Sequence, residues 1–223
     1  MSIAENLNQI KSSLPAHVTL VAVSKTHGPE MIREAYATGQ RHFGENKVQE
    51  LTAKADELPK GIVWHMIGHL QSNKVKFIAP FVNLIHGVDS LKLLQVINKE
   101  AQKNNRIIDC LLQVHIAHES TKFGFSEVEL NEMLAGEELN ELENIRICGL
   151  MGMATFTDNL EQVRSEFRGL HLFFQRLKSG YFSGEGQFKE LSMGMSGDYQ
   201  IAVEEGSTMV RVGSAIFGVR DYH

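Results

Sequence analysis

The sequence contains few cysteines and prolines and no long apolar run. Its 223 residues include 2 Cys and 4 Pro, which excludes a disulfide-rich secreted scaffold and a proline-rich disordered chain. No stretch approaches the ~18 apolar residues that a membrane-spanning helix needs. The first residues also lack the charged-then-apolar profile of a signal peptide. We therefore expect a cytoplasmic protein with no membrane contact.

An excess of basic charge is also absent. The 22 Lys and Arg residues are outnumbered by 27 Asp and Glu residues, giving a formal net charge of -5, which argues against nucleic acid as a partner. What is present is an ordinary globular composition, 43% apolar. Cys110 and Cys148 lie within apolar runs, so we expect both to be reduced thiols in the core.

Short apolar runs alternate with longer amphipathic segments, which predicts strands that alternate with helices. Eight such units in 223 residues give about 28 residues each, near the length of one strand-helix step. We therefore predict an α/β fold, a (β/α)8 TIM barrel, as one domain over residues 1–223. An open doubly wound sheet is the alternative, although no Gly-x-Gly-x-x-Gly follows the first strand. The predicted strands are 18–24, 41–43, 63–67, 83–86, 107–115, 145–151, 190–193 and 208–212.

Several segments between these strands carry helix start signals. A hydroxyl, amide or carboxylate side chain stands where it can accept from the first free N–H groups, in two cases with Glu or Gln three residues later. The predicted starts are Asn46 with Gln49, Ser126 with Glu129, and Asp158 ahead of an amphipathic run to Leu177.

The chemistry of such a barrel lies at the carboxyl ends of its strands. Lys25 directly follows the first strand. An ammonium group at the mouth of an apolar barrel has a depressed pKa, as a Schiff-base lysine requires. A lysine whose charged end extends from the strand end into solvent is the alternative.

A second cluster follows strands seven and eight, where this fold usually holds phosphate. The segment 192–198 is rich in Ser and Gly, and Gly213 and Ser214 follow the eighth strand. Small residues and hydroxyls supply donors to phosphate oxygens there. The alternatives are that Ser196 caps a helix over residues 198–205 and that Gly213 only makes a turn.

Two further polar residues are candidates for the mouth. Arg211 lies within an apolar strand, where a guanidinium is costly without a fixed acceptor, either a carboxylate or the ring nitrogen of a bound heterocycle. Asn46 could reach the mouth or could cap a helix with Gln49.

The ten histidines do not indicate a metal site. His65 and His69 are four residues apart, but Gly68 and the end of a strand separate them, so they are not expected to share a helical face. His86 and His115 stand at strand ends. A histidine there could line the mouth of the barrel, but core or rim histidines are commoner. The sequence contains no Gly-x-Ser-x-Gly motif, so it does not indicate a nucleophilic serine.

Several long motifs, in collinear order from about residue 18 onward, closely resemble the pyridoxal phosphate homeostasis protein family, also called YggS/PROSC. They are Val21-Ala-Val-Ser-Lys25-Thr, His42-Phe-Gly-Glu-Asn46-Lys-Val-Gln-Glu50, Trp64-His-Met-Ile-Gly-His-Leu-Gln71-Ser-Asn-Lys74, Leu191-Ser-Met-Gly-Met-Ser196-Gly-Asp198 and Gly206-Ser-Thr-Met-Val-Arg211-Val-Gly-Ser-Ala-Ile-Phe-Gly218.

This resemblance implies a barrel of the alanine racemase N-terminal type that carries pyridoxal 5'-phosphate (PLP), a fold-type III arrangement. Two departures from the family pattern stand out: Ser214 where threonine is common, and a segment 151–156 that lacks the expected proline. The residues implied are Lys25 as the Schiff-base lysine, Asn46 beside the cofactor, Ser196, Gly213 and Ser214 around the phosphate, and Arg211 at the pyridine nitrogen.

The function implied is intracellular PLP homeostasis, in which the protein buffers PLP without efficient catalysis. An arginine stays protonated, so a pyridine nitrogen that faces it is not readily protonated and the ring is a weak electron sink. Whether PLP is handed on to apo-enzymes stays open, and a monomer is expected. The alternatives are an amino-acid racemase, with Tyr36, Tyr199 or a histidine as second acid/base, and a lysine-dependent aldolase.

Overall fold

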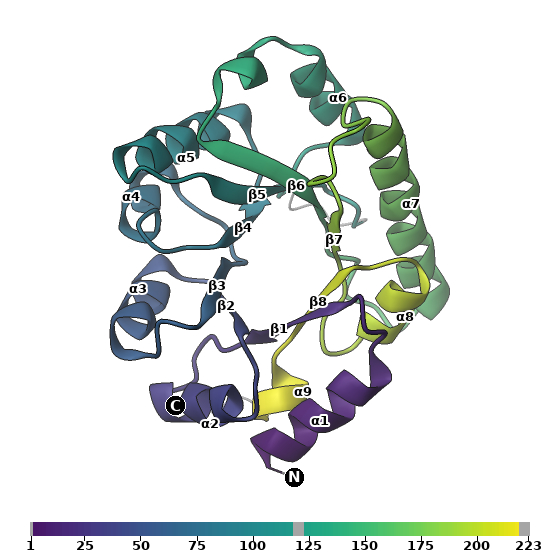
Figure 1. The fold of residues 1–223 in the computed structure, drawn as a ribbon. Coiled ribbons are helices and arrows are strands. Elements are labelled where there is room, and N and C mark those ends of the chain that lie inside the picture. Colours follow the sequence, from purple (N-terminus) through teal and green to yellow (C-terminus); the bar gives the residue numbers. More distant parts are fainter. Residues whose placement is uncertain (1, 118–122, 219–223) are drawn as a thin grey trace.

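The strands close into an eight-stranded parallel barrel in the order β1-β2-β3-β4-β5-β6-β7-β8 (Figure 1). The computed structural model describes residues 2–117 and 123–218. The predicted TIM barrel is therefore confirmed, and the open sheet is wrong because β1 pairs with β8 along four residue pairs. The strands are β1 Thr19–Val23, β2 His42–Glu45, β3 Val63–Met66, β4 Leu84–Val88, β5 Ile108–Gln113, β6 Ile145–Met151, β7 Glu190–Ser192 and β8 Met209–Val212.

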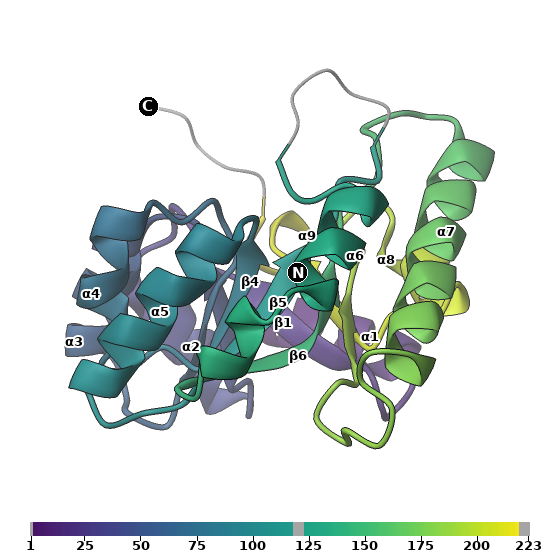
Figure 2. The same ribbon diagram turned by 90° about the horizontal axis from the view of Figure 1, so that it is seen from above.

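Helices surround the barrel, and Figure 2 shows α3, α4 and α5 on one flank and the long α7 on another. Two short 3₁₀ turns, Ser72–Lys74 and Glu138–Glu141, complete the connections. The helices are α1 Ile3–Ser13, α2 Pro29–Ala37, α3 Val48–Glu57, α4 Val75–Ile78, α5 Leu91–Lys103, α6 Glu127–Ala135, α7 Leu160–Ser179, α8 Tyr199–Glu204 and α9 Ser214–Phe217.

Helix α1 precedes the first strand and is not among the predicted segments. It begins with a capping box in which Ser2 and Glu5 each accept from the other's backbone N–H. Its Asn6 side chain donates to the carbonyl oxygen of Ile216 at 2.9 Å. This bond joins α1 to α9, so the first and last described helices lie side by side (Figure 1).

Of the three predicted helix starts, one is confirmed. Ser126 and Glu129 form a capping box at the start of α6. Asn159, one residue after the predicted Asp158, caps α7 by accepting from a backbone N–H. The predicted cap by Asn46 is wrong, because α3 begins at Val48 and the turn out of β2 places residue 47 at the cap position.

Apolar side chains form two layers of core. The larger layer lies between the strands and the helices and includes Phe43, Phe167 and Phe188. A smaller cluster of six residues includes Cys148, whereas Cys110 belongs to the larger layer. Both cysteines are free and buried, as predicted. The smaller cluster comprises Val21, Leu84, Leu111, Cys148, Met151 and Met209.

Candidate functional site

Lys25 lies in the turn at the carboxyl end of β1 and is half-buried. The turn is tight, since the N–H of His27 donates to the carbonyl oxygen of Ser24 at 3.1 Å. Thr26 has a φ of +69°, a left-handed conformation that costs free energy for a β-branched residue. Surrounding contacts must therefore hold this turn.

Those contacts come from α3. The ammonium group of Lys54 donates to the carbonyl oxygen of Ser24 at 2.8 Å. Glu50 accepts the N–H of Thr26 at 2.5 Å and pairs with Lys54 at 2.7 Å. The backbone is thus fixed on both sides of Lys25, which determines where the lysine side chain starts.

A buried carboxylate completes this network. Glu45, the last residue of β2, accepts from the Ser24 hydroxyl at 2.6 Å and from Lys54 at 2.8 Å through the same oxygen, Oε1. Its other oxygen, Oε2, is buried and has no hydrogen-bond partner among the described residues. Burial raises the pKa of Glu45 to about 6, and Lys54 offsets only part of that effect. Lys54 is not among the site residues predicted from the sequence, because a lysine in an amphipathic helix normally faces solvent.

The predicted phosphate residues meet at the ends of β7 and β8. The hydroxyl oxygen of Ser196 accepts the N–H of Gly213 at 3.1 Å. A Cβ atom on Gly213 would lie 3.0 Å from the carbonyl oxygen of Val23, so a side chain at this position would crowd the end of β1. Ser214 is exposed and is the first residue of α9.

Ser196 is not a helix cap. Helix α8 begins at Tyr199, after Asp198 in the cap position. The Asp198 carboxylate accepts from the N–H of Met195 at 2.5 Å, which closes the loop around Ser196 and directs the serine hydroxyl toward Gly213. This loop geometry overturns the N-cap alternative.

Arg211 is buried, with 4% of its surface exposed. It donates to the hydroxyl of Ser192 at 2.6 Å and to the carbonyl oxygen of Gly152 at 3.1 Å. Both acceptors are neutral, and the ion pairs found within residues 2–117 and 123–218 do not include Arg211. Burial lowers its pKa to about 10, with Asp198 acting in the opposite direction. Arg211 has two fixed acceptors, but neither is the carboxylate that was one of the two predicted partners, and its positive charge has no directly bonded anion in the described chain.

Asn46 lies at the same end of the barrel, directly after β2, and is half-buried. A Cβ atom on Gly68 would lie 2.5 Å from the Asn46 carbonyl oxygen, so the loop after β3 approaches the Asn46 backbone closely. The carboxyl ends of parallel strands share one edge. Five of the six predicted site residues therefore follow the carboxyl ends of strands, whereas Arg211 lies within β8. Ser196 and Gly213 are in direct contact.

His65 and His69, which are four residues apart in the sequence, lie in different surroundings. His65 is inside the barrel, whereas His69 is exposed and its Nδ1 atom lies 3.3 Å from a carboxylate oxygen of Asp89. Within the part of the chain that the structure describes, no group of three or more His, Cys, Asp or Glu residues could hold a metal ion. Among the same residues, no helix is both long enough and apolar enough to cross a membrane.

Comparison with known proteins defines the class first. The family model "Alanine racemase, N-terminal domain" matches residues 1–221. Alanine racemase from Bartonella henselae, solved with covalently bound pyridoxal phosphate, superposes with a TM-score of 0.71 at 17% identity, over 97% of this chain and 58% of that one. The fold is thus the barrel of the alanine racemase N-terminal class.

More similar relatives define the family. A pyridoxal phosphate homeostasis protein of Aquifex aeolicus is 42% identical over 91% of this chain and 87% of its own length. PipY of Synechococcus elongatus, solved without and with PLP, gives TM-scores of 0.91 and 0.87 at 39% and 38% identity, over 97% of this chain and 100% of that one. This chain belongs to the pyridoxal phosphate homeostasis protein family.

Proposed function

We propose that this protein binds PLP at the carboxyl mouth of the barrel and buffers it, as a cytoplasmic monomer that holds the cofactor covalently on Lys25. The observation that carries the proposal is the combination of Lys25 after β1 with the Ser196 and Gly213 contact after the neighbouring β8. The structure of PipY with PLP bound supports it, since that chain is 38% identical to this one.

The residues present fit the cofactor. When bound, PLP supplies an aldehyde that condenses with a lysine amine, and a phosphate that needs several hydrogen-bond donors. Ser196 and Ser214 offer hydroxyl donors to that phosphate, and the N–H of Gly213 orients the Ser196 hydroxyl by donating to its oxygen. Val23 crowds residue 213, where a Cβ would lie 3.0 Å from its carbonyl oxygen. Asn46 would lie beside the cofactor.

Arg211 would face the pyridine nitrogen. Even with a pKa of about 10 the guanidinium is protonated near neutral pH, so it disfavours a second proton on a nitrogen in front of it. Arg211 forms no ion pair with another described residue. Its guanidinium N–H groups would donate a hydrogen bond to a neutral ring nitrogen, which accepts it. This arrangement favours holding PLP over the carbanion chemistry of a racemase.

A racemase also needs a second acid/base group across from the lysine. The Tyr36 ring stacks on Arg41 at 4.0 Å, before β2, which is the amino-terminal side of the barrel. The Tyr199 hydroxyl lies 3.4 Å from the hydroxyl of Ser13, at the end of α1. The Tyr36 ring is thus held on the amino-terminal side of the barrel and the Tyr199 hydroxyl lies beside α1, which favours a binding protein over a racemase that uses either tyrosine.

The visible absorption spectrum tests this proposal. Purified protein is mixed with PLP, reduced with borohydride and digested, and the modified peptide is identified by mass spectrometry. We expect a yellow band that borohydride bleaches while it fixes the cofactor covalently on Lys25. Lys25→Ala should lack this band, whereas Lys47→Ala, which removes an exposed lysine, should keep it. A colourless wild-type protein would refute PLP binding.

Catalysis is tested separately. Loaded protein is incubated with L-alanine in deuterated water, and the α-proton signal is followed by NMR. We expect loss no faster than with free PLP, and exchange at enzymatic rates would favour the racemase alternative. Transfer to apo-enzymes is tested by adding loaded protein to an apo-form of a PLP enzyme in the presence of a trap for free PLP.

A further inference from the structure

A chain of hydrogen bonds crosses the inside of the barrel and ends at Arg211. The Nδ1 atom of His42 lies 2.9 Å from Nε2 of His65, and Nδ1 of His65 lies 2.9 Å from Nε2 of His86. The Nδ1 atom of His86 lies 3.0 Å from the Ser192 hydroxyl oxygen, which accepts the 2.6 Å bond from Arg211. These five side chains, His42, His65, His86, Ser192 and Arg211, are called the interior relay below.

The strand register explains why the three histidines meet. His42 is opposite Val63, so His65 stands two residues closer to the carboxyl end of the barrel. His65 is opposite Leu84, and His86 stands two residues further again. Because side chains two residues apart share one face of a strand, the three rings form a rising diagonal from the start of β2 toward the carboxyl mouth.

The positions of the hydrogens follow from Arg211, which can only donate. Ser192 therefore accepts from Arg211. The arrangement that directs every imidazole N–H away from Arg211 has the serine hydroxyl donating to Nδ1 of His86, 3.0 Å away. His86 then carries its proton on Nε2 and donates to His65, which donates from its own Nε2 to His42. The three rings are neutral, and every donor in the relay points away from the buried cation.

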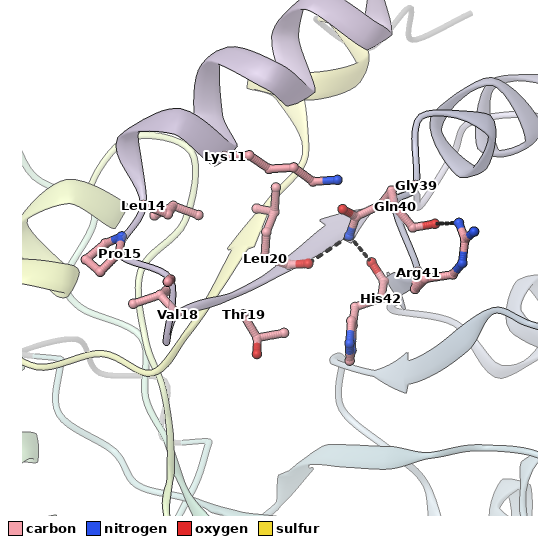
Figure 3. Close-up of a pocket in the computed structure, with 11 residues that line it drawn as sticks. Lys11, Leu14, Pro15, Val18, Thr19, Leu20, Gly39, Gln40, Arg41 and His42 are labelled. Carbon is pink, nitrogen blue, oxygen red and sulfur yellow. Dashed lines mark hydrogen bonds between the residues drawn. The ribbon is translucent and has the colours of Figure 1, made fainter.

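His42 is the most exposed of the five side chains of the relay. His65 is 2% exposed and His86 is completely buried, whereas His42 is half-buried and lines a cavity of about 410 Å³ at the amino-terminal ends of β1 and β2 (Figure 3). Lys11 and Arg41 line the same cavity (Figure 3). The charged residues that line this cavity are therefore basic.

The electrostatic environment keeps the three histidines of the relay neutral. Burial lowers the pKa of all three histidines, that of His65 to about 3. The positive charge of Arg211 lowers the pKa of His86 further, and Asp198 is the carboxylate that acts on Arg211 from the loop after β7. A second positive charge inside the barrel would repel Arg211, so the uncharged form is the stable one.

We propose that His42, His65, His86 and Ser192 are positioning residues for the cofactor site: the histidines fix the direction of the Ser192 hydroxyl, and Ser192 holds the Arg211 guanidinium at the pyridine nitrogen. The proposal rests on the proposed function insofar as Arg211 faces that nitrogen. Gly152 holds the other side of the arginine, since its carbonyl oxygen accepts from Arg211 and its N–H donates to the Ser192 carbonyl oxygen at 3.1 Å.

The first test uses protein loaded with PLP. For Ser192→Ala and His86→Leu we expect an apparent affinity for PLP about tenfold weaker, since a hydrogen bond to a charged group is lost, and a shifted pH midpoint of the visible band. Ser192→Thr keeps the hydroxyl and should restore both. The control is Ser207→Ala, which removes another buried hydroxyl, one bonded to carbonyl oxygens of β7 and β8, and should keep the wild-type midpoint.

The second test needs no cofactor, so it separates failure of this proposal from failure of PLP binding. Imidazole ¹⁵N shifts are measured in the PLP-free protein at pH 7, with thermal unfolding to confirm that each variant is folded. We expect His65 and His86 to carry the proton on Nε2, and Ser192→Ala to change the tautomer balance of His86. A proton on Nδ1 of His86 in the wild type, or a wild-type band midpoint in Ser192→Ala, would overturn the proposal.

Discussion

The ammonium group of Lys54 donates a 2.8 Å hydrogen bond to the carbonyl oxygen of Ser24, the residue that precedes Lys25. Lys54 also pairs with Glu45, whose second carboxylate oxygen has no partner among the described residues. We expect Lys54→Met to lower the free energy of unfolding by about 3–5 kcal/mol, because it leaves a buried carboxylate uncompensated. Urea unfolding at pH 7 measures this change.

A control and a second variant make the Lys54 result specific. Lys47→Met removes an exposed lysine just before the same helix and should change stability by less than about 0.5 kcal/mol. Adding Glu45→Gln to Lys54→Met removes the stranded charge and should recover part of the loss. A Lys54 variant as stable as the wild type would show that the network does not support the turn at Lys25.

The backbone of Gly213 passes close to β1, and this predicts a loss of PLP binding when a side chain is added. In Gly213→Ala the new Cβ would lie 3.0 Å from the Val23 carbonyl oxygen and 3.2 Å from the Val23 Cβ. Residue 213 or Val23 must then give by a few tenths of an ångström, which displaces the N–H that donates to Ser196. We expect PLP affinity to fall by about tenfold or more, as measured by absorbance titration. The matched control is Gly197→Ala, where an added Cβ meets nothing within 4 Å; equal losses in both variants would contradict the assignment of Gly213.

The sequence contained enough to predict the barrel and the position of the site along the chain. Buried parallel strands are short apolar runs, and the carboxyl end of each run is where a barrel presents its chemistry, so Lys25 and Gly213 stood out. Asn46 was ambiguous, because an amide that precedes a helix suits both a cap and a turn. Only the tertiary path of the chain after β2 decided between them.

The supporting residues could not be predicted in the same way. His42, His65 and His86 are separated by 23 and 21 residues along the chain. Only the register of β2, β3 and β4 brings a nitrogen of each ring to 2.9 Å from a nitrogen of the next. Lys54 looks like an ordinary helical lysine until α3 packs against the turn at Ser24. Contacts of this kind depend on strand stagger and helix placement, which local patterns do not determine.

Both cysteines are expected to be unreactive in the folded protein. Cys110 is completely buried, Cys148 is 6% exposed, and burial raises the pKa of both thiols, that of Cys148 to about 11. The thiolate is the reactive form, so a disulfide reagent at pH 8 should label neither thiol until urea unfolds the chain. Ser12→Cys adds an exposed thiol and should react within the mixing time under native conditions. Rapid labelling of wild-type protein would mean that the barrel opens.

The buried histidines predict that the protein loses stability in mild acid. The pKa of His65 is about 3 in the folded chain and near 6.5 when exposed, and the pKa of His86 is also lowered. Below pH 6.5 the unfolded chain therefore binds protons that the folded chain does not. Each such histidine lowers the free energy of unfolding by about 1.4 kcal/mol per pH unit between its two pKa values.

Glu45 works against this acid effect over a narrower range. Its folded pKa is about 6, above the 4.5 of an exposed glutamate, so the folded chain binds the extra proton between those values and one histidine is offset there. We expect a net loss of stability as the pH falls from 6 to 4.5, because the buried histidines together outweigh this one carboxylate, measured by urea unfolding at steps of half a unit. Glu45→Gln should steepen the loss, and His17→Gln, at an exposed position, should leave it unchanged. Stability that stays flat from pH 6.5 to 4.5 would contradict neutral histidines inside the barrel.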